Sequence, residues 1–285
     1  MDARLQRRVQ RYGWDLAAST YESLWQSSLA NVHAALLDSA ALAPGEHVLD
    51  LACGTGLVTL PAARAVGANG RVIGVDIANR MVEALRQRAA EAMLPQVVAL
   101  RMDAEQLALP DDSVDVVLCA LGLMYLPHPD QALLEIKRVL RPGGRTVIAV
   151  WGERARCGWA PLFGVVDAEV RSEVCPMFFG LGQGVALSRL CRSVGLTVVG
   201  DQRLASTLDY ANCDLACDAA FAGGPVALAW QRFDEPTRER ARARYLEAIS
   251  VWQHDGGYRI PAEFVVVSAM APFASRATAA APSPQ

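Results

Sequence analysis

The residues best suited to bind a ligand lie in a short turn within the first third of the chain. The apolar run HVLDLA (47–52) predicts a buried strand, and the segment DLACGTG (50–56) continues from it. Glycines that follow a strand let the backbone approach a bound molecule closely, so Gly54 and Gly56 mark a candidate binding turn. Asp50, the acid at the start of the turn, helps to distinguish between the possible ligands.

The residues after the glycines narrow the choice of ligand. A phosphate-binding loop requires Lys and then Ser or Thr after its second glycine, but Leu57 and Val58 follow Gly56. A dinucleotide turn has a third glycine where this chain has Thr59, so the pattern is weak for a pyrophosphate. Asp50 would also repel a diphosphate, whereas it suits a ligand that carries an ammonium group.

Two further acids stand where predicted strands end. Asp76 follows the core of the strand RVIGVDI (71–77), a position from which an acid accepts hydrogen bonds from both ribose hydroxyls. Asp103 closes the strand QVVALRMD (96–103), and Ala104 follows it, which gives a turn of short side chains that suits an adenine edge. The three acids together favour a ligand with adenosine and a positive charge but without phosphates.

The elements that must position these residues alternate regularly. Short apolar runs predict strands, and amphipathic stretches between them predict helices. This rhythm predicts an α/β fold with a doubly wound, Rossmann-like sheet of seven strands, mostly parallel, with the last strand antiparallel and a helical cap inserted. The strands are expected at 47–52, 71–77, 96–103, 113–121, 145–151, 196–209 and 259–269, with later helices near 159–173 and 184–194.

The chain divides into four predicted parts. Residues 1–43 form an N-terminal helical segment that covers the ligand site, with an aromatic side of Tyr12, Trp14, Tyr21 and Trp25. The core comprises 44–210 and 256–272, because the long stretch between the last two strands needs structure of its own. That stretch, 211–255, is the helical cap, and 273–285 is expected to be a disordered tail.

Composition excludes several classes of partner. The net charge of −3 and pI near 5.8 give no electrostatic footprint for nucleic acid. We expect no membrane span, no signal peptide and no metal site, although Cys213 and Cys217 are four residues apart. Seven cysteines without a secretion signal indicate reduced thiols and a cytoplasmic protein.

Four motifs in order carry a resemblance to a known family. They are VLDLACGTG, VIGVDIANRMVEAL, MDAEQLALPDDSVDVVLCALGLMYLPHPD and QALLEIKRVLRPGG. This run resembles the class I S-adenosylmethionine-dependent methyltransferases (methyltransferase type 11), and it is most similar to the group that includes the ubiquinone and menaquinone biosynthesis C-methyltransferases. The resemblance covers about residues 46–151 and implies S-adenosylmethionine as cofactor and a small-molecule methyl acceptor as partner.

The resemblance also implies how the cofactor lies. The turn from Asp50 to Gly56 would wrap the methionine part, Asp76 would hold the ribose, and an N-terminal aromatic, Tyr12 or Tyr21, would close over the site. The adenine would meet Asp103 and Ala104. The implied cofactor-binding residues are Tyr21, Asp50, Ala52, Cys53, Gly54, Thr55, Gly56, Asp76, Ile77, Met81, Asp103, Ala104, Cys119 and Ala120.

Two departures from the family pattern matter. Ala52 stands where the first glycine of the motif usually lies, and we expect it to adopt ordinary strand-end dihedral angles that narrow the turn without abolishing binding. After the fourth strand no clear base is present, and Tyr125 and His128 are the weak catalytic candidates. This predicts an acceptor that ionises easily or is already nucleophilic.

The function predicted from sequence is methyl transfer by direct displacement to a small, apolar or aromatic molecule. Some cap aromatics would line the acceptor pocket, among Phe178, Phe179, Phe221, Trp230, Tyr245 and Trp252. The alternatives are non-methyl chemistry on the same cofactor, a binding or regulatory role without turnover, and a nicotinamide-dependent reductase, which Thr59 and Asp50 disfavour. A homodimer is compatible with the sequence.

Overall fold

The sheet has the doubly wound order predicted from the sequence. The computed structural model describes residues 2–170, 178–224 and 226–273. The strand order is β3-β2-β1-β4-β5-β8-β6, and β8 runs antiparallel to both β5 and β6. The short β7 pairs with β8 and adds an eighth strand to the seven expected. The strands are β1 (His47–Leu51), β2 (Arg71–Asp76), β3 (Val97–Arg101), β4 (Val114–Ala120), β5 (Leu140–Trp151), β6 (Thr197–Tyr210), β7 (Gln253–His254) and β8 (Gly257–Met270).

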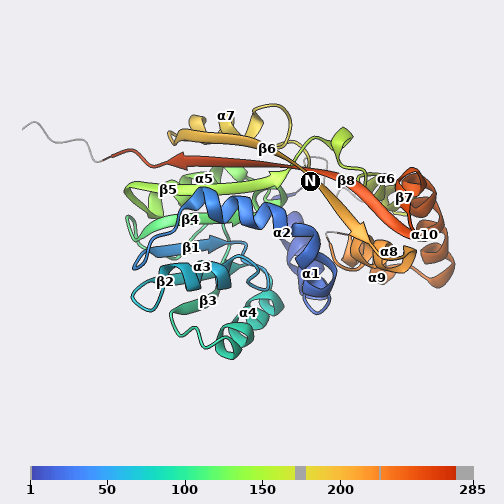
Figure 1. Ribbon diagram of the computed structural model, residues 1–285, viewed down its shortest axis with the longest axis horizontal. Coiled ribbons are helices and arrows are strands. Elements are labelled where there is room, and N and C mark those ends of the chain that lie inside the picture. Colours follow the sequence, from blue (N-terminus) through green and yellow to red (C-terminus); the bar gives the residue numbers. More distant parts are fainter. Residues whose placement is uncertain (1, 171–177, 225, 274–285) are drawn as a thin grey trace, which may run out of the picture.

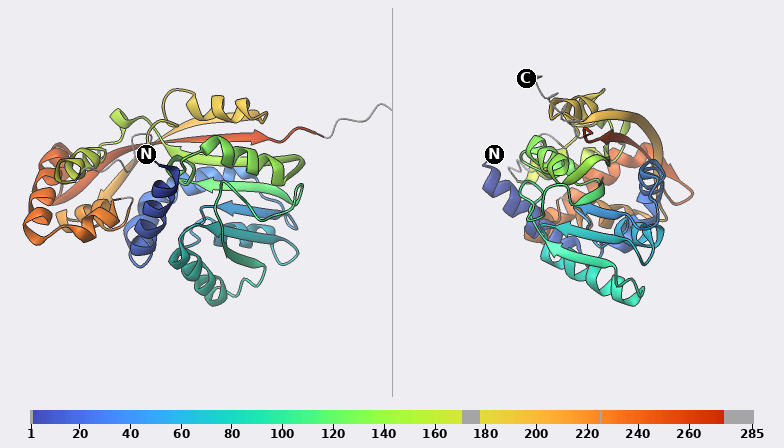
Figure 2. Two further views of the ribbon diagram at one scale, coloured as in Figure 1. Left: turned by 180° about the vertical axis from the view of Figure 1, so that it is seen from behind. Right: turned by 90° about the vertical axis from the view of Figure 1, so that its left-hand side faces the viewer.

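Helices cover both faces of this sheet. Figures 1 and 2 show α2 and α5 on opposite faces of β4 and β5. The helices are α1 (Ala3–Ala17), α2 (Tyr21–Ala40), α3 (Thr59–Val66), α4 (Asn79–Glu91), α5 (Pro129–Val139), α6 (Pro161–Glu169), α7 (Ala186–Ser193), α8 (Cys213–Phe221), α9 (Ala227–Arg232) and α10 (Glu235–Ile249), with short 3-10 turns η1 (Leu123–Tyr125), η2 (Arg154–Arg156) and η3 (Ser250–Trp252).

Local sequence explains where these elements lie. The central strand β1 is buried over Val48–Leu51, as expected for a parallel strand covered on both faces. Helix α4 turns Met81, Leu85 and Ala89 inward at a spacing of four residues, which forms one apolar face. Proline at the first position of α5 supplies a helical φ where no backbone N–H is needed.

Strand β5 begins earlier than the sequence suggested. Arg141–Gly144 were expected only to stop the preceding helix, which does end at Val139. The strand nevertheless begins at Leu140, which pairs with Val114, and the register then shifts so that Arg145 pairs with Val116. The extra residues bulge out of the ladder, helped by Gly143 with φ of +78°.

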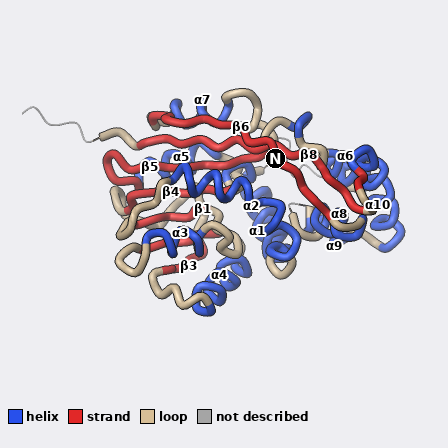
Figure 3. Tube along the Cα trace, viewed as in Figure 1, coloured by secondary structure: helices blue, strands red, loops and turns tan. Residues whose placement is uncertain are grey.

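The N-terminal helices and the predicted cap meet beside the core. Strands β6 and β8 extend past the parallel strands and carry α8, α9 and α10 at their far end (Figures 1 and 3). Helix α1 packs against α4 on the core side and against α9 on the cap side. Helix α10 packs against α6 and α8. The predicted tail beyond Phe273 lies outside the described residues.

Two features of the described residues concern membranes and metal ions. None of the helices in this part of the chain is long and apolar enough to cross a bilayer. The same part of the chain contains no group of three or more His, Cys, Asp or Glu side chains placed to hold a metal ion.

Candidate functional site

A cavity opens at the carboxyl ends of β1, β2 and β4, where a doubly wound sheet binds its ligands. We call it the strand-end cavity. It encloses about 780 Å³ of space free of atoms, part of it open to solvent, within the usual size of a ligand pocket. Its lining residues are Arg7, Gln10, Trp14, Tyr21, Ala52, Gly54, Val75, Asp76, Ile77, Met81, Met102, Asp103, Ala104, Ala120, Leu121, Gly122, Tyr125, Leu126 and Pro127.

Asp76 ties the glycine turn to the end of β2. One carboxylate oxygen accepts a hydrogen bond from the Gly54 N–H at 3.0 Å, and the other accepts from the Ala78 N–H at 2.9 Å. Burial raises the pKa of this carboxyl to about 6, although the two backbone N–H groups oppose that rise. Each oxygen has a second lone pair, so the carboxylate can also accept from hydroxyls in the cavity.

The glycines of the turn are required by conformation and by space. Gly54 and Gly56 have φ of +53° and +94°, in the left-handed region that glycine adopts without strain. A Cβ on Gly56 would lie 2.5 Å from the Leu85 side chain, whereas one on Gly54 would meet only Tyr21, at 3.9 Å. Gly54 therefore presents its backbone to the cavity, and Gly56 allows α4 to pack closely.

Ala52 corrects one expectation. It was expected to have ordinary strand-end dihedral angles, but its φ is +59°. The left-handed region crowds Cβ against the backbone, which costs roughly 1–2 kcal/mol for a residue other than glycine. The Ala52 side chain faces Gly122, where an added Cβ would lie 2.4 Å from that of Ala52. The turn keeps the conformation suited to glycine, and Gly122 leaves room for the methyl group.

The turn after β3 is fixed by an ion-pair cluster with α1. The Asp103 carboxylate accepts from the Glu105 N–H at 3.0 Å and lies 3.1 Å from Nε of Arg7. Arg7 also pairs with Glu105, whose other carboxylate oxygen accepts from the His128 N–H at 2.8 Å. These contacts hold α1 over one side of the strand-end cavity.

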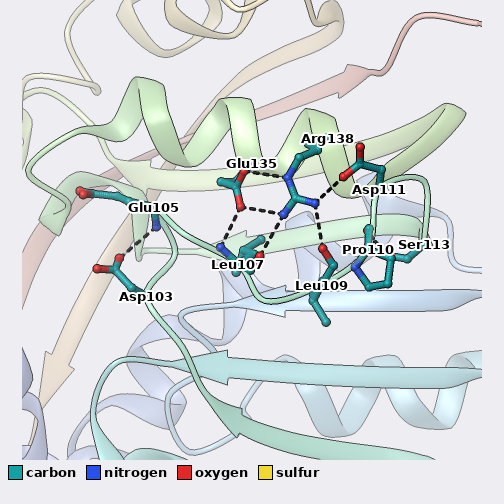
Figure 4. A network of polar contacts seen from close by, with 9 residues as sticks. All are labelled: Asp103, Glu105, Leu107, Leu109, Pro110, Asp111, Ser113, Glu135 and Arg138. Atoms are coloured by element: carbon teal, nitrogen blue, oxygen red, sulfur yellow. Dashed lines mark hydrogen bonds and ion pairs between the residues drawn. The ribbon is translucent and has the colours of Figure 1, made fainter.

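The loop that continues from this turn is anchored by Arg138 of α5. Figure 4 shows its guanidinium group inserted between the loop and the helix. It donates to the carbonyl oxygens of Leu107 and Leu109 at 3.0 and 2.8 Å, and it pairs with Glu135 at 2.8 Å. Glu135 accepts in turn from the Leu107 N–H at 2.8 Å. These contacts hold the loop that follows Asp103 against α5.

Asp50 lies beneath the turn and does not line the cavity. Its side chain is buried and accepts a hydrogen bond from the Thr59 hydroxyl at 2.5 Å. Burial raises its pKa to about 7, and the nearby Asp76 carboxylate adds to the rise. Asp50 therefore joins the start of α3 to β1 and places a titratable group below the cavity floor.

Most of the residues predicted to bind the cofactor come together here, but their contacts with it stay predictions. The strand-end cavity is lined by Tyr21, Ala52, Gly54, Asp76, Ile77, Met81, Asp103, Ala104 and Ala120. The predicted residues Asp50, Cys53, Thr55, Gly56 and Cys119 lie outside its lining. Burial raises the pKa of the Cys119 thiol to about 12, so it stays protonated.

The catalytic candidates differ in position. Tyr125 is buried and lines the cavity, and its ring meets that of Trp14 edge to face at 5.2 Å between centroids. His128 is exposed and lines a separate polar hollow instead. Tyr12 is 46% exposed and lies outside the strand-end cavity, so Tyr21 is the better placed of the two predicted covering aromatics.

Three residues of α1 line the cavity although none of them was predicted to bind the cofactor. Arg7, Gln10 and Trp14 line the strand-end cavity from one face of the helix. Their spacing of three and four residues is the signal that could have identified them. The Trp14 indole donates to Oε1 of Gln10 at 3.1 Å, while the buried Nε2 of Gln10 has no hydrogen-bond partner among the described residues.

A second cavity adjoins the first toward the cap. We call it the aromatic cavity; it encloses about 430 Å³ of space free of atoms, part of it open to solvent. Trp14, Tyr21, Leu121 and Tyr125 line both cavities. The remaining lining residues are Trp25, Leu29, Trp151, Trp159, Leu162, Ala220, Gly223 and Gly224, so the cavity has no charged side chain among its described lining.

The donor set of the strand-end cavity fits S-adenosylmethionine better than a phosphate-bearing cofactor. Asp76 and Asp103 offer acceptors for hydroxyl and amino groups, and Gln10 offers an unused donor. The one basic side chain of the described lining, Arg7, is already paired with Asp103 and Glu105. Two buried acids, Asp50 and Asp76, favour a positively charged ligand nearby.

Comparisons with known proteins agree with this geometry. Residues 48–144 match the sequence profile of a family described as a methyltransferase domain. The aklanonic acid methyltransferase DauC of Streptomyces sp. (strain C5) is 36% identical over 46% of this chain and 60% of its own. The ubiquinone/menaquinone biosynthesis C-methyltransferase UbiE of Burkholderia mallei (strain SAVP1) is 36% identical over 51% of this chain and 59% of its own.

A solved structure shows the same fold. A candidate methyltransferase from Bacillus halodurans C-125 superposes with a TM-score of 0.62 at 19% sequence identity, over 85% of this chain and 99% of that protein. The chain therefore spans about three fifths of the length of its curated relatives and nearly all of this structural neighbour. The match over residues 48–144 and these relatives confirm the predicted resemblance of this part of the chain to methyltransferases.

Proposed function

We propose that this chain, which matches a methyltransferase domain over residues 48–144, transfers the methyl group of S-adenosylmethionine to a small, apolar or aromatic molecule. One observation carries the proposal. A cavity with acids at strand ends adjoins a second cavity lined by aromatic side chains, and four residues belong to both. The cofactor and the methyl acceptor would meet at those four residues, Trp14, Tyr21, Leu121 and Tyr125.

The strand-end cavity would hold the cofactor through residues of β1, β2 and the turn after β3. Asp76 would accept from the ribose hydroxyls, and the backbone of Gly54 and Ala52 would face the methionine part. Asp103 and Ala104 would meet the adenine. When bound, the cofactor supplies an electrophilic methyl group on a sulfonium centre. The chain contributes position, and orientation alone accounts for up to roughly 7–11 kcal/mol of a displacement barrier.

The aromatic cavity would hold the acceptor and exclude water. Its described lining has no charged side chain, and several of its aromatic rings pack edge to face, as Trp14 does against Tyr21 at 5.8 Å. A dry site favours a transition state in which positive charge is being dispersed. The two relatives act on aklanonic acid and in ubiquinone/menaquinone biosynthesis, which supports a small-molecule acceptor here.

Loss of a proton would depend mainly on the acidity of the acceptor itself. His128 lies outside both cavities, and Cys119 keeps its proton. Tyr125 is the catalytic candidate that lines both cavities. This arrangement suits an acceptor that ionises easily, such as a phenol, an acidic carbon or a thiol. The cytoplasmic location and a homodimer stay predictions.

The test begins with calorimetric titration of the full chain with S-adenosylmethionine and with NAD. We expect micromolar binding of the former alone, lost in Asp76→Ala. Release of S-adenosylhomocysteine is then measured with a panel of phenols, β-dicarbonyl compounds and thiols. Binding of NAD instead would support a reductase. Cofactor binding without product for any acceptor would support a binding or regulatory role.

A further inference from the structure

One residue that lines the aromatic cavity has a buried donor without a partner among the described residues. Trp159 follows η2, is 5% exposed and lines the cavity. Its ring lies 4.7 Å from that of Trp151 and 5.5 Å from that of Phe178, between centroids. Its indole Nε1 is buried and has no hydrogen-bond acceptor among the described residues. Buried indole N–H groups are normally paired, so this donor calls for an explanation.

Two other tryptophans of the same cavity, Trp25 and Trp14, have acceptors in the protein. The Trp25 indole donates to the Gly223 carbonyl oxygen at 2.9 Å. The fit is close, because a Cβ on Gly223 would lie 2.7 Å from that indole nitrogen. The Trp14 indole donates to Gln10 at 3.1 Å. The protein thus provides acceptors for two indoles of this cavity, whereas the described residues offer none to Trp159.

We infer that Trp159 is a specificity residue whose indole N–H donates to an oxygen of the molecule that fills the aromatic cavity. The cavity would then select compact, neutral, planar molecules with a phenolic or carbonyl oxygen over hydrocarbons of the same shape. That such a molecule is the methyl acceptor rests on the proposed function, whereas its binding does not.

The chemistry of the cavity supports this class of ligand. Aromatic walls favour a ring, and the absence of charged side chains from the described lining disfavours an ion with no partner. A donor at the oxygen of a phenol or enol also stabilises that oxygen when it loses its proton. Such help would suit a site in which His128 and Cys119 are not placed to act as bases.

The experiment compares two probes that differ in one group. 2-Naphthol and 2-methylnaphthalene have similar shape, but only the former has an oxygen. Each is titrated into the full chain saturated with S-adenosylhomocysteine, and the ratio of their association constants is taken. The ratio is used because effects of the substitution on hydrophobicity and packing act on both probes and cancel. Wild type is compared with Trp159→Phe.

The matched control is Trp230→Phe. Trp230 stacks on Phe221 at 4.5 Å in the cap and lines neither cavity. We expect the naphthol-to-methylnaphthalene ratio to fall about three- to tenfold in Trp159→Phe and by less than twofold in Trp230→Phe, since a net hydrogen bond has about that value. A ratio that changes by less than twofold in Trp159→Phe, or failure of both probes to bind, would overturn the inference.

A second measurement needs no substitution. In protein with 15N-labelled tryptophan, the Trp159 indole resonance should move downfield with 2-naphthol and not with 2-methylnaphthalene. An identical response to both probes would count against the inference even if the variant failed to fold. This outcome can be told apart from failure of the proposed function. If S-adenosylhomocysteine does not bind, the proposed function is wrong. The selectivity of the cavity for 2-naphthol over 2-methylnaphthalene tests the inference about Trp159 independently.

Discussion

Asp76 offers the sharpest test of how the strand-end cavity works. Its carboxylate accepts from Gly54 at 3.0 Å and from Ala78 at 2.9 Å while it also faces the cavity. Asparagine has the same shape but only one oxygen. In Asp76→Asn, the NH2 group replaces one of the two acceptor oxygens. It therefore faces one of these backbone N–H groups and cannot accept from a ribose hydroxyl, and the variant also lacks the negative charge.

The expected loss can be worked from these contacts. A hydrogen bond to a charged group is worth about 1.5–3 kcal/mol, so losing one to the ribose corresponds to a roughly 10- to 150-fold weaker affinity. A backbone N–H that faces an amide donor loses its acceptor. This lowers the free energy of unfolding by about 1–3 kcal/mol. Because burial raises the pKa of Asp76 to about 6, the comparison belongs at pH 8, where the carboxyl is ionised.

Calorimetric titration with S-adenosylhomocysteine at pH 8 measures the effect, and Asp50→Asn is the matched control. Asp50 is also buried near the end of the adjacent strand, but it accepts a hydrogen bond from Thr59 and does not line the cavity. We expect Asp76→Asn to weaken binding at least tenfold more than Asp50→Asn. If a folded Asp76→Asn binds within threefold of wild type, or if Asp50→Asn loses as much affinity, the assignment of Asp76 to the ribose is wrong.

Three further predictions follow from the same region. Ala52→Gly should raise the free energy of unfolding by roughly 0.5–1 kcal/mol in a chemical melt, since relief of left-handed strain exceeds the added chain entropy; a loss of stability would contradict it. Arg7→Ala should free α1 from Asp103, so that limited proteolysis cuts α1 faster and S-adenosylmethionine binds several-fold more weakly, while Arg8→Ala, an exposed neighbour, should do neither. Burial raises the folded-state pKa of Asp50 to about 7, so the folded protein holds a proton that the unfolded chain releases near pH 4. Stability without ligand should therefore fall as pH rises from about 4 to 7, and the thermal melting temperature of Asp50→Asn should fall less over that range; equal slopes would refute the reasoning.

The core of the fold was predictable because its strands are buried on both faces. A strand such as β1, buried over Val48–Leu51, has an almost continuous apolar sequence that ends abruptly at polar or glycine residues. What escaped prediction depends on pairing. β5 begins at Leu140 because Val114 of β4 is available to pair with it, and β7 exists because Gln253 lies opposite Tyr258. Neither partner is visible from local sequence.

The site was predictable to the extent that strand ends define it. Asp76 and Asp103 line the cavity because parallel strands bring their carboxyl ends to one edge. The direction of a side chain at a strand end is harder to predict, and Asp50 points to Thr59 rather than into the cavity. Arg7 and Gln10 were missed because their role depends on α1 docking against α4 and α9, which is a tertiary effect.

The two cavities have different origins along the chain. The acids and glycines of the strand-end cavity, among them Gly54, Asp76 and Asp103, all lie within the 48–144 methyltransferase domain. Of the twelve described residues that line the aromatic cavity, only Leu121 and Tyr125 lie within it. The others come from α1 and α2, from the end of β5 and the segment that follows it, and from the cap. Similarity over the domain therefore carries information about the cofactor and little about the acceptor, so the acceptor has to be sought through the residues that surround Trp159.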